Sequence, residues 1–288
     1  MRSATRLGVA LLTAHCCLLT AHRPLLTAQE RDVARERADY AHWLATAPSS
    51  PLGAVALAPV GRGIEIGPAG SDIPLDGFPH HRVVQRGGRV TLSGPTGNRP
   101  LLRGRPVTSG SYTFLAGGLT GRATLAVHRP PPAEAKTASW YPYDPAAAFV
   151  VSLAPPPRPA VVRVLAPDGT EVEAAEAGTL SVTVEGKGVM LLVRRMAGAT
   201  PEESELEVYF RDATNGKGTY PAGRFVTLVP VEGGRYLLDF NRARNPFCAY
   251  SSVYPCPAPW RGNTIGAAVK AGERYTGGGL DPGMRSEQ

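Results

Sequence analysis

The sequence predicts a mainly β protein with one N-terminal helix, a β-sandwich in its first half and an antiparallel β domain in its second half. Glycine (33) and proline (28) make up about a fifth of the 288 residues, which disfavours long helices. Charged residues are only 19% and apolar residues 43%, a balance too apolar for a disordered chain. Short apolar runs alternate with turn residues, and none reaches the roughly 18 residues that a membrane-spanning helix needs.

Residues 1–28 resemble an export signal. Arg2 and Arg6 precede an apolar stretch over 7–19, and Leu26-Thr27-Ala28 supplies a cleavage site before Gln29. We therefore expect an exported protein, periplasmic or secreted, with no transmembrane segment once the signal is removed. The remaining chain has 28 basic and 24 acidic residues, a net charge of +4. That charge is ordinary for a soluble protein and gives no indication of nucleic-acid binding.

Only two cysteines, Cys248 and Cys256, remain after removal of the signal. Two cysteines eight positions apart in an exported protein predict one local disulfide. Closing so short a loop contributes roughly 2–3 kcal/mol on the chain-entropy estimate. The alternative is a free, reactive Cys248.

The chain divides into segments of different composition. Residues 29–50 predict an amphipathic helix and a linker; the helix either packs on the following domain or binds a partner. Residues 51–129 predict a β-sandwich, with a hairpin at Gly87-Gly88. A Pro-rich linker follows over 130–138. The C-terminal β domain spans 139–276, and 277–288 form a flexible tail. Further hairpins are predicted at Pro167-Asp168-Gly169, Glu185-Gly186-Lys187-Gly188 and Glu232-Gly233-Gly234.

The first half resembles a degenerate forkhead-associated domain. The resemblance is carried by Ile64-Glu65-Ile66-Gly67, Ser71 to Leu75, His81, Asn98 and Arg103 to Val107. In that family an Arg after the glycine and a Ser three before the His hold phosphothreonine. Here Pro68 and Phe78 occupy these positions, so the charge-assisted contacts to a phosphate are missing. The resemblance implies the sandwich shape without phosphopeptide binding.

The second half carries the densest motifs. They are the stretch from Phe210 to Arg224, the stretch from Asp239 to Tyr250, Tyr254 to Pro259, Asn263, and Ala271-Gly272-Glu273. These motifs closely resemble a bacterial family catalogued as domain of unknown function 1684. The departures are Arg244, where an aromatic residue is usual, Ala258 and the Arg261-Gly262 step. The resemblance implies membership and brings no activity with it.

The polar residues of these motifs allow two interpretations. In the first, Arg224 pairs with Asp212 or Asp239 in a buried ion pair, and Asn and Thr side chains fix irregular loops. In the second, the same residues form a polar pocket with Arg224 as the anchor for an anion. The candidate ligand-binding residues are Asp212, Thr214, Thr219, Tyr220, Arg224, Asn241 and Asn245.

Several chemistries lack their residues. The four histidines after the signal (His42, His80, His81 and His128) all precede the C-terminal domain, so it contains no local base for a nucleophilic Ser or Cys. Two cysteines alone do not make a zinc site, and no phosphate-binding glycine loop is present, so we expect no metal and no cofactor. We favour a non-catalytic binding module for a small polar or anionic ligand or an envelope partner. A hydrolase using Asp212 and Asp239, with Glu273 as a third carboxylate, and a purely structural protein are the alternatives.

Overall fold

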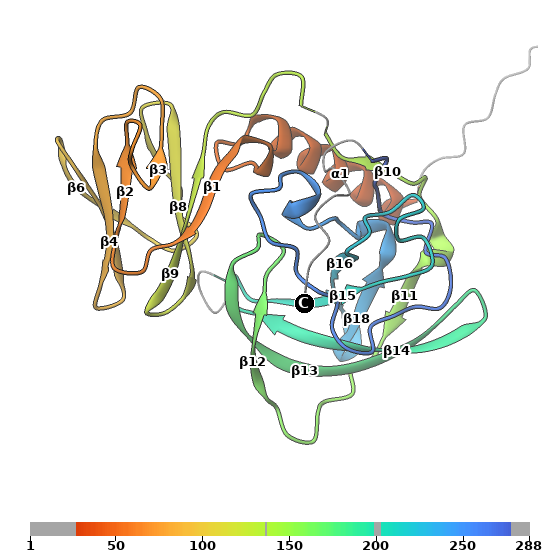
Figure 1. Ribbon diagram of the computed structural model, residues 1–288. Coiled ribbons are helices and arrows are strands. Elements are labelled where there is room, and N and C mark those ends of the chain that lie inside the picture. The colour runs from red at the N-terminus through yellow and green to blue at the C-terminus, as the bar shows by residue number, and fades with distance from the viewer. Residues whose placement is uncertain (1–26, 136, 199–202, 278–288) are drawn as a thin grey trace, which may run out of the picture.

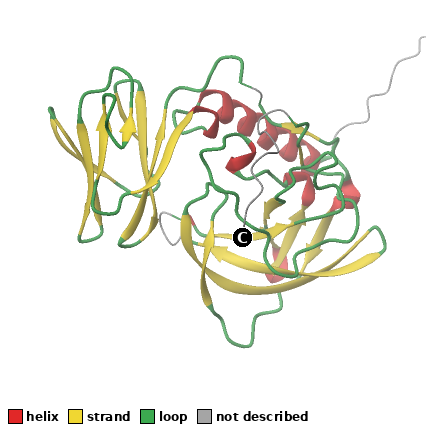
Figure 2. Cartoon of the chain, in the orientation of Figure 1, coloured by secondary structure: helices red, strands yellow, loops and turns green. Residues whose placement is uncertain are grey.

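The protein is described here by a computed structural model, which covers residues 27–135, 137–198 and 203–277. Residues 1–26 of the predicted export signal and nearly all of the predicted tail lie outside these residues, whereas the last two residues of the predicted signal, Thr27 and Ala28, belong to the start of the helix described next. The described chain is mainly β, with one α-helix at its start, as the sequence predicts (Figures 1 and 2).

Helix α1 (Ala28–Thr46) packs on the C-terminal domain rather than on the sandwich (Figure 1). Its first turn is capped by Thr27, whose hydroxyl accepts a hydrogen bond from the Glu30 amide at 3.1 Å. The guanidinium of Arg37 donates to the carbonyls of Tyr141 (2.9 Å) and Asn241 (2.8 Å). The helix is therefore part of the C-terminal unit, which agrees with the packed-helix interpretation.

Two sheets form the sandwich that follows α1. One has the order β1-β9-β8-β7 and the other β3-β2-β4-β5-β6, and all pairs except the parallel β2–β3 pair are antiparallel. A shared apolar core, which includes Ile66, Leu92, Phe114 and Leu125, lies between them. The strands are β1 (Ala54–Pro59), β2 (Ile64–Gly67), β3 (Ile73–Pro74), β4 (His81–Arg86), β5 (Arg89–Gly94), β6 (Gly97–Leu101), β7 (Val107–Ser109), β8 (Tyr112–Leu119) and β9 (Arg122–His128).

The C-terminal domain has a five-stranded antiparallel sheet of order β12-β13-β14-β15-β16. It also has a three-stranded sheet, β11-β18-β17, and a two-stranded pair, β10–β19. The largest apolar core of the protein packs residues of the two larger sheets together. The strands are β10 (Ser139–Trp140), β11 (Ala148–Val151), β12 (Val161–Leu165), β13 (Glu171–Val184), β14 (Lys187–Met196), β15 (Glu205–Phe210), β16 (Arg224–Thr227), β17 (Val229–Val231), β18 (Arg235–Asp239) and β19 (Glu273–Arg274).

The hairpins predicted from turn residues are present. Arg86 pairs with Arg89 across Gly87-Gly88, and both glycines have the positive φ that such a two-residue turn requires. Val184 pairs with Lys187 across Glu185-Gly186 in the same way. Short one-turn helices occupy several connections: η1 (Pro51–Gly53), η2 (Pro145–Ala147), η4 (Glu232–Gly234), η5 (Phe240–Arg242) and η6 (Phe247–Ala249).

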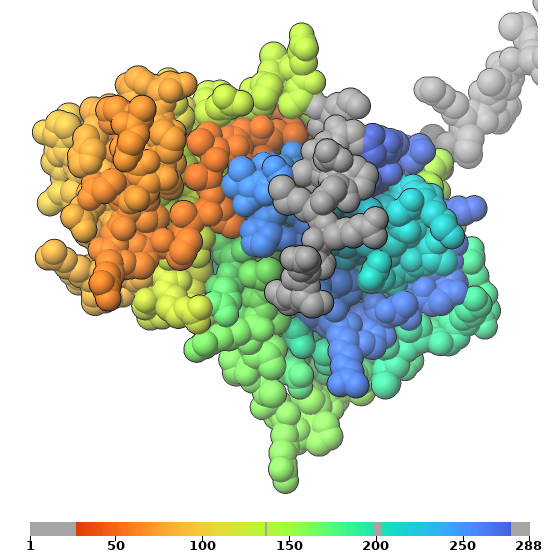
Figure 3. Space-filling model, in the orientation of Figure 1, coloured from red at the N-terminus to blue at the C-terminus, as the bar shows by residue number. Residues whose placement is uncertain are grey.

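The sandwich and the C-terminal domain touch along β8 and β9 (Figure 3). The His128 Nε2 lies 2.8 Å from the Tyr254 hydroxyl, and Arg122 pairs with Glu171 at 3.2 Å. A Cβ added at Gly117 would lie only 3.2 Å from the Thr170 methyl group, so the two units approach closely there. This contact creates a cleft whose lining is described below.

Candidate functional site

Asp212 and Arg224 form a fully buried ion pair. The Arg224 Nη2 lies 2.9 Å from the Asp212 Oδ2, and both side chains have 0% exposure. The guanidinium also donates to the carbonyls of Val269 (2.9 Å), Glu273 (3.3 Å) and Ala271. Of the two partners that the sequence allowed for Arg224, the structure selects Asp212. With so many donors directed at the protein itself, Arg224 is not placed to anchor an anion from solvent.

The loop after Asp212 is held by its own side chains. The Asp212 Oδ1 accepts hydrogen bonds from the amide and hydroxyl of Thr214 at 2.8 and 2.5 Å, and the Thr214 hydroxyl meets that of Thr219 at 2.8 Å. Asn215 accepts from the Asp212 amide and donates to the Tyr220 carbonyl. Short polar side chains that bond nearby backbone are typical of such turns. These contacts fix the loop that positions β16.

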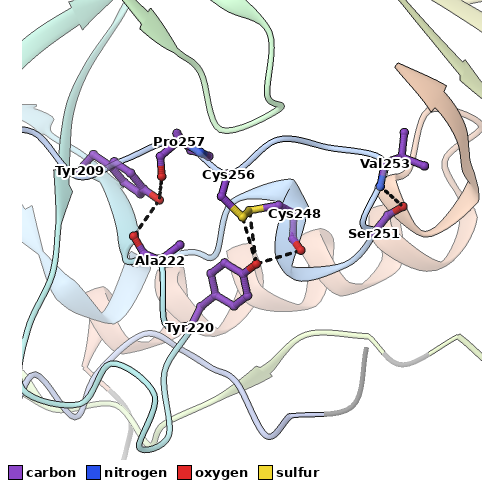
Figure 4. The surroundings of a disulfide bond; sticks show 8 residues. All are labelled: Tyr209, Tyr220, Ala222, Cys248, Ser251, Val253, Cys256 and Pro257. Atoms are coloured by element: carbon purple, nitrogen blue, oxygen red, sulfur yellow. Dashed lines mark hydrogen bonds between the residues drawn. A yellow bond between two sulfur atoms is a disulfide. The ribbon is translucent and has the colours of Figure 1, made fainter. Parts of the chain in front are cut away.

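Tyr220 joins this loop to the disulfide. The structure links Cys248 to Cys256, as the sequence predicts, and the Tyr220 hydroxyl donates to the Cys248 carbonyl at 3.0 Å (Figure 4). The same hydroxyl lies 3.4 and 3.3 Å from the two sulfur atoms. Tyr209 supports the other side of the loop by donating to the Pro257 carbonyl at 2.9 Å (Figure 4). Burial raises the pKa of Tyr220 to about 12, so its hydroxyl stays protonated and remains a donor.

Asp239 and Asn241 tie the helix to the C-terminal domain. The Asp239 Oδ1 accepts from the backbone and side-chain amides of Asn241, both at 2.9 Å, and its Oδ2 accepts from Gln29 at 3.1 Å. Asn241 in turn exchanges two hydrogen bonds with the backbone of Asp144. Both side chains have 0% exposure. Strands β16 and β18 do not pair with each other, because β16 pairs with β15 and β18 pairs with β17. Arg224 and Asp239 are therefore not placed side by side in a hairpin.

The Ala-Gly-Glu motif has one structural task at each residue. The Ala271 carbonyl accepts from Arg224. Gly272 has φ +76°, and a Cβ there would lie 2.5 Å from the Phe240 carbonyl oxygen, so no other residue fits. The Glu273 Oε2 accepts from the Asn245 amide at 2.8 Å, and its Oε1 accepts from the Tyr250 hydroxyl. The first two residues build the fold, and the third reaches a cavity.

A cavity of about 300 Å³ lies beside β19 and the end of the linker. Its polar and charged lining includes Asn245, Tyr250, Glu273 and Arg274, and Tyr275 contributes an aromatic wall. Asn245 is 2% exposed, and its Oδ1 has no hydrogen-bond partner in the described part of the chain. Burial raises the pKa of Glu273 to about 7, against the opposing effect of its hydrogen bonds from Asn245 and Tyr250. The cavity thus holds an open acceptor beside a carboxyl group that titrates near neutrality.

The structure separates the predicted site residues into three groups. Asn245 and Glu273 line this cavity. The buried loop network contains Asp212, Thr214, Thr219, Tyr220 and Arg224, and the helix anchor contains Asp239 and Asn241. None of these seven lines any cavity described here. The sequence interpretation missed Tyr250, which lies two residues after Cys248 inside a motif, and Tyr275, which follows the Ala-Gly-Glu motif directly.

Within the described residues, no group of three or more His, Cys, Asp or Glu side chains is arranged to hold a metal ion. None of the described helices is long and apolar enough to cross a membrane.

Comparison with known proteins places the C-terminal half in a family. The model of the family described as protein of unknown function DUF1684 matches residues 134–274. The solution NMR structure of an uncharacterized protein of Haloarcula marismortui is 34% identical, covers 48% of this chain and 76% of that chain, and has a TM-score of 0.42. No curated protein matches the chain. The family match does not include residues 51–129, so their resemblance to forkhead-associated domains stays a prediction. The motifs between Asp212 and Glu273 all fall within the matched region, and the chain belongs to the DUF1684 family of unknown function.

Proposed function

We propose that the protein is an exported binding protein that takes up a small neutral ligand rich in hydroxyl or amide groups. The ligand lies in the cavity lined by Asn245, Tyr250, Glu273 and Tyr275. The observation that carries this proposal is the buried, unpartnered Oδ1 of Asn245 on the cavity wall. An unsatisfied buried acceptor costs about 1–3 kcal/mol, which a ligand donor would recover on binding.

The surroundings of this acceptor favour a neutral ligand over an anion. When ionised, Glu273 accepts a hydrogen bond from a ligand donor, and when protonated it donates one to a ligand acceptor. Its pKa of about 7 makes both forms accessible near neutral pH. The ring of Tyr275 offers an apolar face of the kind that packs against a sugar ring or an alkyl amide. An anion would lie next to Glu273, and Arg224 is already bound to carbonyls and to Asp212. Arg274 also lines the cavity, but it is exposed and its guanidinium lies over the Tyr141 ring, 5.3 Å from the ring centre.

Calorimetric titration with glucose, N-acetylglucosamine and acetamide tests the proposal. We expect at least one of them to bind, and Asn245→Ala to weaken binding roughly tenfold, the value of one hydrogen bond of about 1.4 kcal/mol. Asn98→Ala, on exposed β6, is the matched control and should bind as the parent does. Asn241→Ala should lower stability while the folded protein binds normally. Binding that survives Asn245→Ala unchanged would remove this cavity from consideration, and failure of all three probes would favour the purely structural role.

One observation also favours a catalytic alternative at the same cavity. Glu273 is a buried carboxyl group whose pKa lies near 7, and it is held by Tyr250, as a general acid or base would be. Asp212 and Asp239, the other two carboxylates considered, are both buried in hydrogen-bonded networks away from the cavities described here. A hydrolase of glycans or esters would therefore depend on Glu273. Turnover that is lost in Glu273→Gln and kept in Asp212→Asn would establish it.

Export rests on the signal-like residues 1–28 and on the disulfide, which is stable in an oxidising compartment. Intact mass of the natively expressed protein, with and without reduction before alkylation, is the test. We expect a chain that begins near Gln29 and whose thiols react only after reduction. A chain that keeps residues 1–28 with readily alkylated Cys248 would overturn it.

A further inference from the structure

A second cleft lies between the sandwich and the C-terminal domain. It consists of two cavities of about 200 and 270 Å³. They are adjacent and share the lining residues Ala166, Asp168, Val172, Ala197, Gly198 and Phe247. The smaller cavity has β8 and β9 on one wall, and the larger opens along β15. The motifs of the family contribute Phe247 and Tyr254 to this cleft.

Glu207, in the centre of β15, is the unusual residue of the cleft. Along this strand Leu206, Val208 and Phe210 face the main core, so Glu205, Glu207 and Tyr209 face the other side. Glu207 is only 7% exposed and lines the larger cavity. Within the described part of the chain its carboxylate has no hydrogen-bond or ion-pair partner. Its oxygens are not fully enclosed by protein, so they reach the open space of the cavity, where a ligand can supply the missing partner.

The charged side chains that line the larger cavity are all acidic. Asp168, Glu203 and Glu205 line the same cavity, and no Lys, Arg or His does so among the described residues. Arg194 stands opposite Glu207 in the pairing of β14 with β15, but its guanidinium lies over the Trp260 ring, 4.6 Å from the ring centre. Arg105 approaches only Glu203, at 3.8 Å and at an exposed position. The larger cavity is therefore a cation-attracting site.

The smaller cavity is lined by one buried histidine, His128, and by one exposed arginine, Arg103. His128 is 1% exposed and lines this cavity. Its Nε2 contacts the Tyr254 hydroxyl. Its Nδ1 has no partner of full hydrogen-bond geometry in the described residues, and the backbone of Thr113, which is opposite His128 in the pairing of β8 with β9, interacts with the ring. Burial lowers the pKa of His128 to about 4, so the ring is neutral near pH 7 and does not repel a cation.

We propose that this cleft binds a small aliphatic ammonium compound. The cationic nitrogen lies between Glu207 and Asp168, and the alkyl chain packs against Phe247 and Met196, which line the same cavity. The aromatic ring of Phe247 adds a favourable face for the cation. A metal ion is disfavoured because the described carboxylates do not converge as a ligand set. An ammonium compound needs only one or two carboxylates at hydrogen-bond distance.

Proton linkage gives the proposal a readout other than affinity. Burial, with smaller contributions from Glu205 and Asp168, raises the pKa of Glu207 to about 8. Glu207 is thus mostly protonated at pH 7 and must ionise when it pairs with an ammonium group. Binding should release close to one proton at pH 7, and the affinity should rise from pH 7 to pH 9, where an alkylamine is still charged.

Calorimetric titration of the disulfide-bonded protein with 1,5-diaminopentane, in buffers of different ionisation enthalpy, tests the proposal. We expect saturable binding with proton release at pH 7, and no binding of 1,5-pentanediol or glutarate, which share the chain length without the positive charge. Glu207→Gln should weaken binding about tenfold or more and abolish proton release. Glu232→Gln, in an exposed turn, is the matched control and should behave as the parent does.

Three results would overturn the proposal. They are the absence of binding by the diamine, equal binding by the diol, and unchanged affinity in Glu207→Gln. Glu207→Gln preserves shape and removes a buried titrating group, so loss of folding is not expected. Asn245→Ala should leave diamine binding intact, which separates this site from the neutral-ligand cavity.

Discussion

Replacing Asp212 by Asn tests whether the densest motif of the family is structural. An Asn that keeps its oxygen at the Oδ1 position retains the bonds from Thr214 and from the Val269 amide, which lies at 3.2 Å. Its NH2 group then faces the Arg224 Nη2, which lies 2.9 Å from the carboxylate in the parent. Two donors oppose each other, and the guanidinium is left as a buried charge without its counter-ion. In the other orientation of the Asn amide, its NH2 group occupies the Oδ1 position, and the three hydrogen bonds accepted there, two from Thr214 and one from Val269, are lost.

The expected cost is about 3–5 kcal/mol, the range for breaking a fully buried ion pair by removing one partner. Urea unfolding of the disulfide-bonded protein, followed by tryptophan fluorescence, measures it. Arg224→Met should cost a similar amount, because three backbone carbonyls lose a donor, and the double variant should cost less than the sum of the two. Asp76→Asn, at an exposed turn, is the control and should stay within about 0.5 kcal/mol. A cost below about 1 kcal/mol for Asp212→Asn, or strictly additive single costs, would refute this reasoning.

Three further predictions concern stability. Replacing Cys248 and Cys256 together by Ser should lower the free energy of unfolding by roughly 2–3 kcal/mol in urea titrations, and an unchanged midpoint would contradict the stapling role. Burial raises the pKa of Glu207 from 4.5 to about 8. The stability that comes from its protonated form is complete below pH 4.5 and is lost as the pH rises through 8. At pH 9 Glu207→Gln should therefore be more stable than the parent by about 3–5 kcal/mol, and at pH 4 the two should be equally stable. The lowered pKa of His128 works in the opposite direction. The stability that comes from its neutral ring is present above pH 6.5 and is lost, by up to about 3 kcal/mol, as the pH falls through 4. In thermal unfolding scans His128→Asn should not lose this stability at acidic pH.

Local signals in the sequence were enough for the turns, the helix and the disulfide. Gly87-Gly88 and Glu185-Gly186 specify two-residue hairpins through backbone conformation alone, which requires no knowledge of the rest of the fold. The helix follows from the apolar residues that its sequence places on one face, although its cap, Thr27, and its first residue, Ala28, were assigned to the predicted signal. The eight-residue spacing of the cysteines makes a bond possible whichever way the strands pair. Each of these features depends on residues close together in the chain.

The choice of partner for Arg224 could not be made in this way. Asp212 and Asp239 lie 12 and 15 positions from it on either side; Asp212 follows β15, and Asp239 is the last residue of β18. The choice depends on whether β16 pairs with β15 or with β18, which is a matter of non-local sheet register. Glu207 was missed for a related reason. On an alternating strand it resembles a solvent-facing residue, and only the packing of distant segments around the cleft buries it.

Asn245 and Asn263 show why motif density does not identify the ligand site. Both are buried asparagines of the family motifs. Asn263 accepts from the Leu192 amide and donates to the carbonyls of Leu192 and Tyr209, so its amide is fully used in joining β14 to β15. Asn245 leaves its oxygen free on a cavity wall. A family can retain both residues for entirely different reasons, and the sequence alone presents them alike. Unused hydrogen-bonding capacity next to a cavity, rather than membership in a motif, is therefore the property by which we place the ligand at Asn245.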